Sequence, residues 1–340
     1  MNLTPDIFTI SSQKQFEKIA LKVFRFQYEN NLVYQEFCDF LKTDVQKVKS
    51  LEQIPFLPIQ FFKSHKVVSN ENPIQKTFVS SGTTSPLAPK GETITVTNKI
   101  ITSKHFVTDI SLYEESYRKG FSQFYGNIQD YVVLALLPSY LEREGSSLIY
   151  MVEDLIKMTN NPESGFYLHN HEELIEKLVR LDNSGQNVVL IGVTYALLDL
   201  IESKKFQLKH TIIMETGGMK GRRKEMIREE LHEQLCNGFG VTAIHSEYGM
   251  TELLSQAYSL GNGVFECPSW MQILVRDTED ALTYVHFGKS GGINVIDLAN
   301  INSCSFIATQ DLGKKNPNTT FEVLGRFDNS DIRGCNLMVL

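Results

Sequence analysis

Two apolar stretches decide the fold, residues 131–138 (YVVLALLP) and residues 187–193 (NVVLIGV). Each has apolar side chains at consecutive positions and so has no polar face for water, which is typical of parallel strands covered by helices on both sides. Strand-like runs follow at 210–216 (HTIIMET) and 241–249 (VTAIHSEYG). Helical patterns separate the strands. This alternation predicts an α/β protein.

We expect the helices at 99–119, 146–158, 172–181, 196–201 and 222–235. Past residue 261 the pattern changes to short strand-like runs with Gly-rich turns, which indicates an antiparallel or barrel-like module. These runs lie at 270–277, 281–288, 304–311 and 320–327. The chain is therefore divided into four predicted units: an N-terminal helical segment (1–75), an α/β core (76–260), a β-rich subdomain (261–328) and a short C-terminal tail (329–340).

Composition excludes several classes of protein. The chain has 340 residues, of which 42% are apolar and 21% charged, with a formal net charge of −7. That size and apolar content are enough to bury a large core, and the acidic balance gives no overall electrostatic attraction for nucleic acid. No apolar run approaches the roughly 20 residues of a membrane span, and the first residues lack the pattern of a signal peptide, so we expect a cytoplasmic protein.

The 5 cysteines are scattered and contain no C-x-x-C pair, which argues against both a disulfide framework and a zinc knuckle. Reduced thiols are expected. The H-x-E order at 245–247 has no downstream P-C-x-x-C, so a deaminase-type zinc site is excluded as well.

Three polar segments carry candidate chemistry. The first is the run SSGTTSP at 80–86, which follows a strand-like stretch. Its hydroxyls and its glycine can offer several donors to a phosphate, although a polar turn explains the same residues. The Walker and Rossmann spacings are absent.

The second is SEYGMTEL at 246–253, at the carboxyl end of an apolar strand. Tyr248 offers a flat ring for a nucleobase, Thr251 a hydroxyl for a phosphate, and Glu252 an oxygen ligand for Mg²⁺. Thr251 also suits a helix N-cap, with Glu252 in the first turn, and both interpretations can hold together. The third segment is Asp311 with, fifteen residues later, Arg326 in a Gly-Arg turn. A carboxylate and a guanidinium there can hold ribose or phosphate, whereas a polar surface turn is the simpler alternative.

The order of these segments along the chain resembles the adenylate-forming superfamily, which includes the acyl-CoA ligases. The resemblance implies that the Ser/Thr/Gly loop holds the phosphates of ATP, that the Tyr-Gly-x-Thr-Glu segment holds adenine, phosphate and Mg²⁺, and that the later Asp and Arg hold the ribose. These implied roles fall on Ser81, Gly82, Thr83 and Thr84, on Tyr248, Gly249, Thr251 and Glu252, and on Asp311 and Arg326.

The segments at 136–155, 215–231, 246–259 and 325–340 narrow the resemblance to the acyl-protein synthetase (LuxE-like) branch, which activates fatty acids. It implies the large N-terminal domain of the superfamily, with helix-covered, mostly parallel sheets and a smaller β-rich subdomain. The phosphate loop departs from the usual pattern, because Ser85 stands in a glycine position and the nearest lysine is Lys90. The run GRFD at 325–328 resembles the hinge that precedes a mobile C-terminal domain with a catalytic lysine. Only residues 329–340 follow it here, so we expect that domain to be absent.

Cys335, near the end of the chain, is the candidate acceptor of the acyl group. The resemblance implies acyl transfer to a cysteine near the C-terminus, and Arg333 beside it can lower the thiol pKa and so favour the nucleophilic thiolate. An unreactive buried thiol is the alternative, which we accept for the other cysteines. Lys220, with Arg222 and Arg223 at a predicted helix start, is the candidate cation for the transition state, although a solvated basic turn explains the same run.

The sequence thus predicts an ATP- and Mg²⁺-dependent acyl-protein synthetase that forms an acyl-adenylate and passes the acyl group to Cys335. The expected substrate is a fatty or aromatic carboxylic acid, because the apolar runs at 146–151 and 192–198 can line a hydrophobic slot. An acyl-transferase or reductase is the expected protein partner. Two alternatives remain open: a ligase that uses free coenzyme A, and a non-catalytic nucleotide-binding module.

Overall fold

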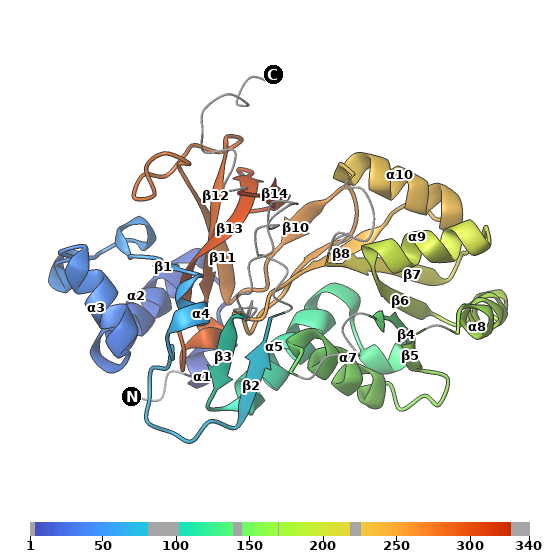
Figure 1. Cartoon of the computed structure of the whole chain (residues 1–340), viewed down its shortest axis with the longest axis horizontal. Helices are drawn as coiled ribbons and strands as arrows, with labels where there is room; N and C mark the ends of the chain where they lie inside the picture. Colours follow the sequence, from blue (N-terminus) through green and yellow to red (C-terminus); the bar gives the residue numbers. More distant parts are fainter. Residues whose placement is uncertain (1–3, 81–101, 139–144, 169, 218–225, 328–340) are drawn as a thin grey trace, which may run out of the picture.

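A 12-stranded sheet organises the molecule (Figure 1). The structure is a computed structural model that describes residues 4–80, 102–138, 145–168, 170–217 and 226–327. The strands follow one another in the order β11 (Met271–Arg276), β12 (Ser290–Asp297), β13 (Phe306–Lys315), β14 (Phe321–Arg326), β10 (Val264–Glu266), β9 (Ala257–Ser259), β8 (His245–Tyr248), β7 (Thr211–Thr216), β6 (Val188–Val193), β4 (Val132–Leu136) and β5 (Gly165–Tyr167). A further strand, β1 (Leu57–Pro58), pairs with β13.

The half of the sheet from β5 to β8 is parallel. Every residue of β4 and β6 is buried, because helices cover both faces of these strands. Helices α5 (Ile110–Tyr125) and α7 (Ser147–Met158) lie on one face, and α9 (Thr194–Ser203) and α10 (Arg228–Phe239) on the other (Figure 1). The predicted α/β class and the two strands that decided it are confirmed.

The other half of the sheet, from β9 to β14, is antiparallel, and it confirms the predicted β-rich part. Strand β9 ends at Ser259, and this residue pairs with Phe265 of β10. The sheet is therefore continuous across the boundary predicted at residue 260. The division of the chain into four units stays a prediction.

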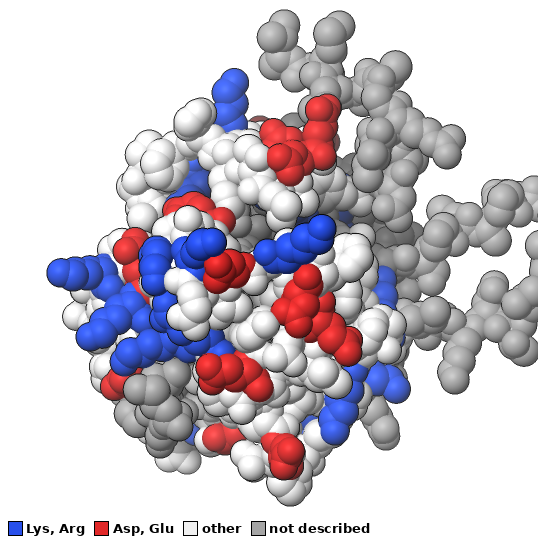
Figure 2. All heavy atoms as spheres, turned by 90° about the vertical axis from the view of Figure 1, so that its left-hand side faces the viewer, with Lys and Arg blue, Asp and Glu red and all other residues white. Residues whose placement is uncertain are grey.

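The N-terminal helices α2 (Gln13–Asn30) and α3 (Leu32–Phe40) pack against the antiparallel half. Phe24 and Tyr34 place their rings 6.3 and 6.1 Å from the ring of Phe306 in β13. The buried amide of Gln27 donates to the carbonyl oxygens of Asn300 and Ile301, at 3.1 and 2.9 Å. The outward side of this layer carries charged side chains of both signs (Figure 2). The N-terminal segment thus forms part of the same core as the sheet.

The remaining elements are short or peripheral. They are α1 (Thr4–Ile7), α4 (Phe61–Ser64), α8 (His171–Asn183), the two-stranded sheet of β2 (Lys76–Val79) with β3 (Lys104–Val107), and the 3₁₀ turns η1 (Val45–Lys47), η2 (Leu51–Gln53), η3 (Ile128–Asp130) and η4 (Leu298–Asn300). Among the described residues, none of the helices combines the length and the apolar character that crossing a bilayer requires.

Three predicted elements were wrong in type or extent. Lys104–Val107 is strand β3, paired with β2, where a helix over 99–119 was expected; α5 begins only at Ile110, after Asp109 caps it by accepting from the amide of Ser111. The strand expected at 281–288 is reduced to a single bridge between Tyr284 and Arg276. The helix expected over 222–235 begins at Arg228 in the described residues.

The helices expected at 146–158, 172–181 and 196–201 are confirmed as α7, α8 and α9.

Candidate functional site

A cluster of Tyr248, Asp311 and Arg326 forms where strands β8, β13 and β14 approach one another. The hydroxyl of Tyr248 donates to Oδ2 of Asp311 at 2.9 Å, and Nε of Arg326 lies 3.2 Å from Oδ1 of the same carboxylate. Asp311 and Arg326 are direct partners across the β13–β14 pair. Three of the residues singled out from the sequence therefore meet at one carboxylate, although they lie far apart in the chain.

The ring of Tyr248 packs against two other aromatic side chains. Its ring centroid lies 6.0 Å from that of Phe265 and 5.7 Å from that of Phe321, and both contacts are edge-to-face. Only 8% of Tyr248 is exposed, and burial together with the neighbouring Asp311 carboxylate raises its pKa well above the ordinary value. The buried hydroxyl of this residue therefore fixes the Asp311 carboxylate. Arg326 is the exposed member of the cluster, with a side-chain exposure of 62%.

The turn after β8 carries Thr251 and Glu252. The amide of Leu253 closes it by donating to the carbonyl oxygen of Met250 at 3.1 Å. Nδ1 of His105, from β3, lies 2.9 Å from the carbonyl oxygen of Thr251. The side-chain amide Nδ2 of Asn300 donates to the carbonyl oxygen of Glu252 at 2.8 Å. The backbone of this turn is therefore held from both sides, and the side chains of Thr251 and Glu252 start from a fixed position.

Asp297 fixes the residues that follow the turn. Its buried carboxylate accepts from the amides of Leu254 and Ser255, at 2.8 and 3.0 Å, and from the Ser255 hydroxyl at 2.5 Å. Burial raises the pKa of Asp297 to about 6, while these donors work in the opposite direction. Sequence reasoning did not single out Asp297, whose only signal was an acidic residue at the end of an apolar strand.

Glu252 is the candidate metal ligand. Its side chain is buried, and burial raises its pKa while a hydrogen bond from Ser103 and the charge of Arg326 lower it. The described residues contain no group of three or more His, Cys, Asp or Glu side chains that could hold a metal ion. A single carboxylate fits Mg²⁺, which keeps several waters and takes oxygen ligands from substrate phosphates. It does not fit a metal that needs a full set of protein ligands.

Ser80 and Ser103 flank the segment that contains the predicted phosphate loop. The amide of Ser80 donates to the carbonyl oxygen of Ser103 at 3.0 Å, and the amide of Ser103 donates to the Ser80 hydroxyl at 2.9 Å. Since Ser103 also bonds to Glu252, the chain enters and leaves this segment beside the candidate metal ligand. Ser81, Gly82, Thr83, Thr84, Lys220 and Cys335 themselves lie outside the described residues.

Neighbouring side chains leave no room for a Cβ atom at position 249, so glycine is needed there for space and not for its backbone angles. A Cβ atom at this position would collide with Oε1 of Glu247 and would press on Gln256. The glycine between Tyr248 and the turn therefore leaves room for the side chain of Glu247, which points to the opposite face of the sheet from Tyr248.

A buried ionic network behind the cluster was missed by sequence reasoning. Glu215, at the end of β7, accepts from Arg228 Nη1 at 2.6 Å and from the Ser246 hydroxyl at 2.8 Å, and His232 lies 3.5 Å away. Burial raises the pKa of Glu215, but these partners outweigh it and the pKa is lowered. The Arg228 guanidinium also lies 5.2 Å above the ring of Phe265, which supports Tyr248. The network thus joins β7, β8 and α10 behind the cluster of Tyr248, Asp311 and Arg326.

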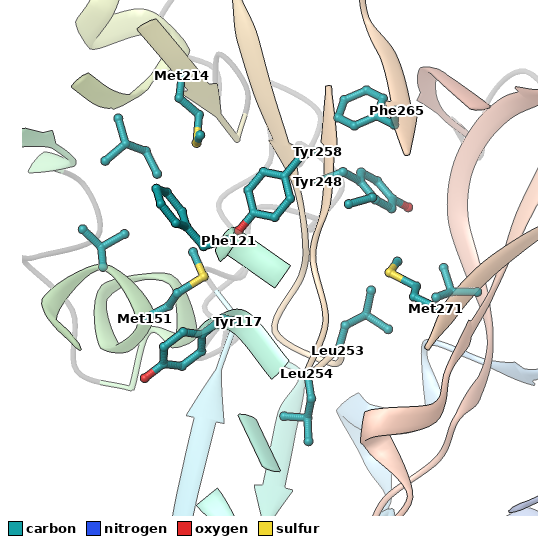
Figure 3. Packing of buried hydrophobic residues seen from close by; sticks show 14 of the residues in the cluster. Tyr117, Phe121, Met151, Met214, Tyr248, Leu253, Leu254, Tyr258, Phe265 and Met271 are labelled. Carbon is teal, nitrogen blue, oxygen red and sulfur yellow. The ribbon is translucent and has the colours of Figure 1, made fainter. Parts of the chain in front are cut away.

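An apolar cavity lies on the other face of β8, between the sheet and helices α5 and α7. It has room for about one water molecule. Phe121, Met151, Met214 and Tyr258 converge there, whereas Tyr248 and Phe265 lie on the far side of the strands (Figure 3). Of the two apolar segments predicted to line an acyl slot, only 146–151 contributes to the lining, through Met151.

Comparison with known proteins bears on the family and the fold of this chain. The family model described as "Acyl-protein synthetase, LuxE" matches residues 4–108 and 148–340. A long-chain-fatty-acid–luciferin-component ligase of Photorhabdus luminescens is 35% identical over 72 residues, which cover 21% of this chain and 61% of the relative. The chain therefore spans less than two thirds of that relative's length.

Solved structures show the same fold. ATP-bound MatB from Rhodopseudomonas palustris matches with a TM-score of 0.52 and 16% identity, over 74% of this chain and 47% of that one. A 2-hydroxyisobutyryl-CoA ligase in complex with its acyl-adenylate and CoA matches with a TM-score of 0.62 and 13% identity, over 94% of this chain and 72% of that one. At these identities the likeness concerns the fold, which is that of adenylate-forming ligases, as predicted.

Proposed function

Because this chain belongs to the LuxE acyl-protein synthetase family, we propose that it uses ATP to convert a carboxylic acid to an acyl-adenylate and then transfers the acyl group to a thiol. The observation that carries the proposal is the meeting of Tyr248, Asp311 and Arg326 at one carboxylate, beside the turn that carries Glu252. A nucleotide bound there has its ribose and its phosphates within reach of different members of the same group.

Asp311 and Arg326 are the proposed ribose ligands. Both oxygens of Asp311 already have partners, but Arg326 is exposed and can release its oxygen to a ribose hydroxyl. Tyr248 is the positioning residue that keeps the carboxylate in place. The nucleobase-binding role that the sequence motif suggested for the Tyr248 ring stays a proposal beside this positioning role.

Thr251, Glu252 and the loop residues Ser81, Gly82, Thr83 and Thr84 are the proposed phosphate side of the site. Mg²⁺ held on Glu252 would neutralise charge on the phosphate oxygens. A carboxylate oxygen of the acid forms a bond to the α-phosphorus while the bond to pyrophosphate breaks. Lys220 is the proposed cation for the charge that builds up in this step.

Cys335 is the proposed first acceptor of the acyl group. Its sulfur forms a bond to the acyl carbon while AMP leaves. The other thiols are poor alternatives, because burial raises the pKa of Cys38 and Cys267 to about 12 and also raises those of Cys236 and Cys304. A fatty acid is the proposed substrate, supported by the name of the Photorhabdus relative. An acyl-transferase or a reductase is the proposed next partner.

The test is intact mass spectrometry of the full chain after incubation with ATP, Mg²⁺ and a panel of carboxylic acids. We expect a mass increase of one acyl group that neutral hydroxylamine removes. Cys335→Ser should abolish the adduct and the matched variant Cys236→Ser should retain it. Acyl-CoA formed from added coenzyme A, with no adduct on the protein, would show that free coenzyme A is the acceptor.

A further inference from the structure

Two buried polar side chains, at and just before strand β3, face the turn that carries Thr251 and Glu252. His105 is 1% exposed and Ser103, two residues earlier, is 2% exposed, whereas Lys104 between them is exposed. Residues two apart lie on the same face of an extended chain. Ser103 forms a hydrogen bond with the Glu252 side chain, and Nδ1 of His105 lies 2.9 Å from the carbonyl oxygen of Thr251. Both contacts therefore reach the proposed phosphate side of the site.

The contact between His105 and Thr251 requires a proton on the ring. A carbonyl oxygen only accepts, so Nδ1 has to donate. Burial lowers the pKa of His105 to about 4, and the bonds to Thr251 and Asn300 oppose this shift without cancelling it. The ring is therefore neutral near pH 7, and a neutral ring has a single N–H to give to one of these two neighbours.

Asn300, the other neighbour of the ring, is oriented without that proton. Its Nδ2 donates to the carbonyl oxygens of Glu252 and Cys304, at 2.8 and 2.9 Å, which leaves Oδ1 3.0 Å from Nε2 of His105. A cavity with room for about one water molecule borders His105 and Asn300, so a water there can donate to both Nε2 and Oδ1. Within the described part of the chain, by contrast, His105 is the one hydrogen-bond partner of the Thr251 carbonyl oxygen. These contacts favour the proton on Nδ1.

We propose that His105 is a positioning residue for the phosphate side of the site, acting through the carbonyl oxygen of Thr251. The inference rests on the proposed function and adds to it a buried residue that none of the sequence motifs contains. The N–H of Nδ1 holds the peptide group between Thr251 and Glu252, the two residues whose side chains are proposed to bind phosphate and Mg²⁺. Without this bond the peptide group can rotate, and the hydroxyl and the carboxylate lose their fixed positions relative to the phosphates.

Two amide variants separate the contacts of the ring. The side chain introduced by His105→Asn places its amide nitrogen near the position of Nδ1, and the longer one introduced by His105→Gln places it near that of Nε2. The first variant therefore keeps a donor for Thr251, whereas the second keeps a donor for Asn300. Both lose the edge-to-face contact with Phe62, whose ring centroid lies 5.7 Å from that of His105. A purely structural role of His105 therefore predicts similar effects of the two changes.

The test measures acid-dependent pyrophosphate release by the full chain at varied concentrations of ATP with Mg²⁺. We expect kcat/KM for ATP to stay within about twofold of the wild-type value in His105→Asn and to fall roughly tenfold in His105→Gln. KM for the acid should be unchanged in both variants. The matched control His210→Gln lies at an exposed position before β7, at the opposite end of that strand from Thr216, and should keep the wild-type kinetics.

The outcomes separate this inference from the function on which it rests. Equal kcat/KM for ATP in His105→Asn and His105→Gln would overturn the role of His105 and leave the adenylating function intact. Absence of pyrophosphate release by the wild type with every acid would count against the proposed function itself.

Nitrogen NMR of the histidine side chains in the wild-type chain tests the inference without any substrate, and it decides if His105→Gln does not fold. The signal that is missing from His105→Asn belongs to His105. A proton on Nδ1 of this ring supports the inference, and a proton on Nε2 alone overturns it.

Discussion

Glu247 and Tyr248 are neighbours in the chain, and their side chains lie on opposite faces of the sheet. Glu247 accepts from the Thr216 hydroxyl, whereas Tyr248 donates to Asp311. Tyr248, Asp311 and Arg326 could be grouped from the sequence because each belongs to a motif with a known order. Their direct contact could not be predicted from the sequence, because it depends on the pairing of Asp311 with Arg326 and on the strands that lie between β8 and β13 in the sheet. Glu247 was passed over with the H-x-E order, although an acid within an apolar strand was itself a signal.

Replacement of Tyr248 by phenylalanine tests the positioning role. The change removes the hydroxyl that donates to Asp311 and keeps the ring that packs on Phe265 and Phe321. We expect KM for ATP to rise roughly tenfold with a smaller change in kcat, and stability to fall by about 1 kcal/mol. Steady-state kinetics with varied ATP measure the first effect.

The matched control is Tyr28→Phe. Tyr28 donates to Asp39 at 2.8 Å on the exposed side of the N-terminal helices, far from the cluster in the fold. This variant should have wild-type KM for ATP. Equal KM values for ATP in the Tyr248 and Tyr28 variants would contradict the proposed role of Tyr248 in nucleotide binding.

The titration of Glu247 predicts a pH dependence of stability. Its folded-state pKa of about 7 lies above the ordinary 4.5, so the folded state favours the protonated form. The corresponding stability is complete below about pH 4.5 and is lost as the pH rises through about 7. Relative to Glu247→Gln, the wild type should lose stability between about pH 4.5 and pH 8.

Urea unfolding measures this difference, with the single tryptophan, Trp270, as the reporter. Trp270 is buried and its indole nitrogen lies 3.0 Å from the hydroxyls of Ser116 and Ser255, so its fluorescence reports on the centre of the fold. Stability profiles of the two proteins that run parallel across this pH range would contradict the assignment.

Among the elements, long apolar strands were predictable and short polar ones were not. Strands β4 and β6 are buried on both faces, and their composition alone indicates that. Strand β3 alternates exposed and buried residues over Lys104–Val107 and depends on its partner β2, so a helical pattern from the adjacent α5 masked it. Strand β12 was missed, because its first residues, Ser290 and two glycines, read as a turn.

Replacement of Gln27 in α2 by alanine tests how the N-terminal helices are joined to the sheet. The buried amide bonds to the carbonyl oxygens of Asn300 and Ile301, and its oxygen accepts from the amide of Ser305 at 3.0 Å. The variant leaves these backbone groups unpaired, and we expect a loss of about 2–4 kcal/mol in the free energy of unfolding. Lys18→Ala, at an exposed position of the same helix, should change it by about 0.5 kcal/mol or less. Equal stability of the two variants would contradict the role given to Gln27.

For the whole molecule, the fold class and the family were predictable from the order of motifs, but the role of the first 75 residues was not. They contain none of the motifs, yet they contribute β1 to the sheet and pack Phe24 and Tyr34 on Phe306. The packing of β1 beside β13 follows from contacts between residues about 250 positions apart, which no local pattern encodes. The N-terminal segment thus supports the strand that carries Asp311.

The central claim is that the Tyr248–Asp311–Arg326 cluster is the nucleotide site of an adenylating enzyme. ATP–pyrophosphate exchange tests it most directly, with a panel of carboxylic acids, the wild-type chain, Asp311→Asn, and the exposed control Asp280→Asn. We predict exchange that appears only when an acid is added, that falls roughly tenfold or more in Asp311→Asn, and that is unchanged in Asp280→Asn. Exchange at the wild-type rate in Asp311→Asn, or no exchange with any acid, would contradict the claim.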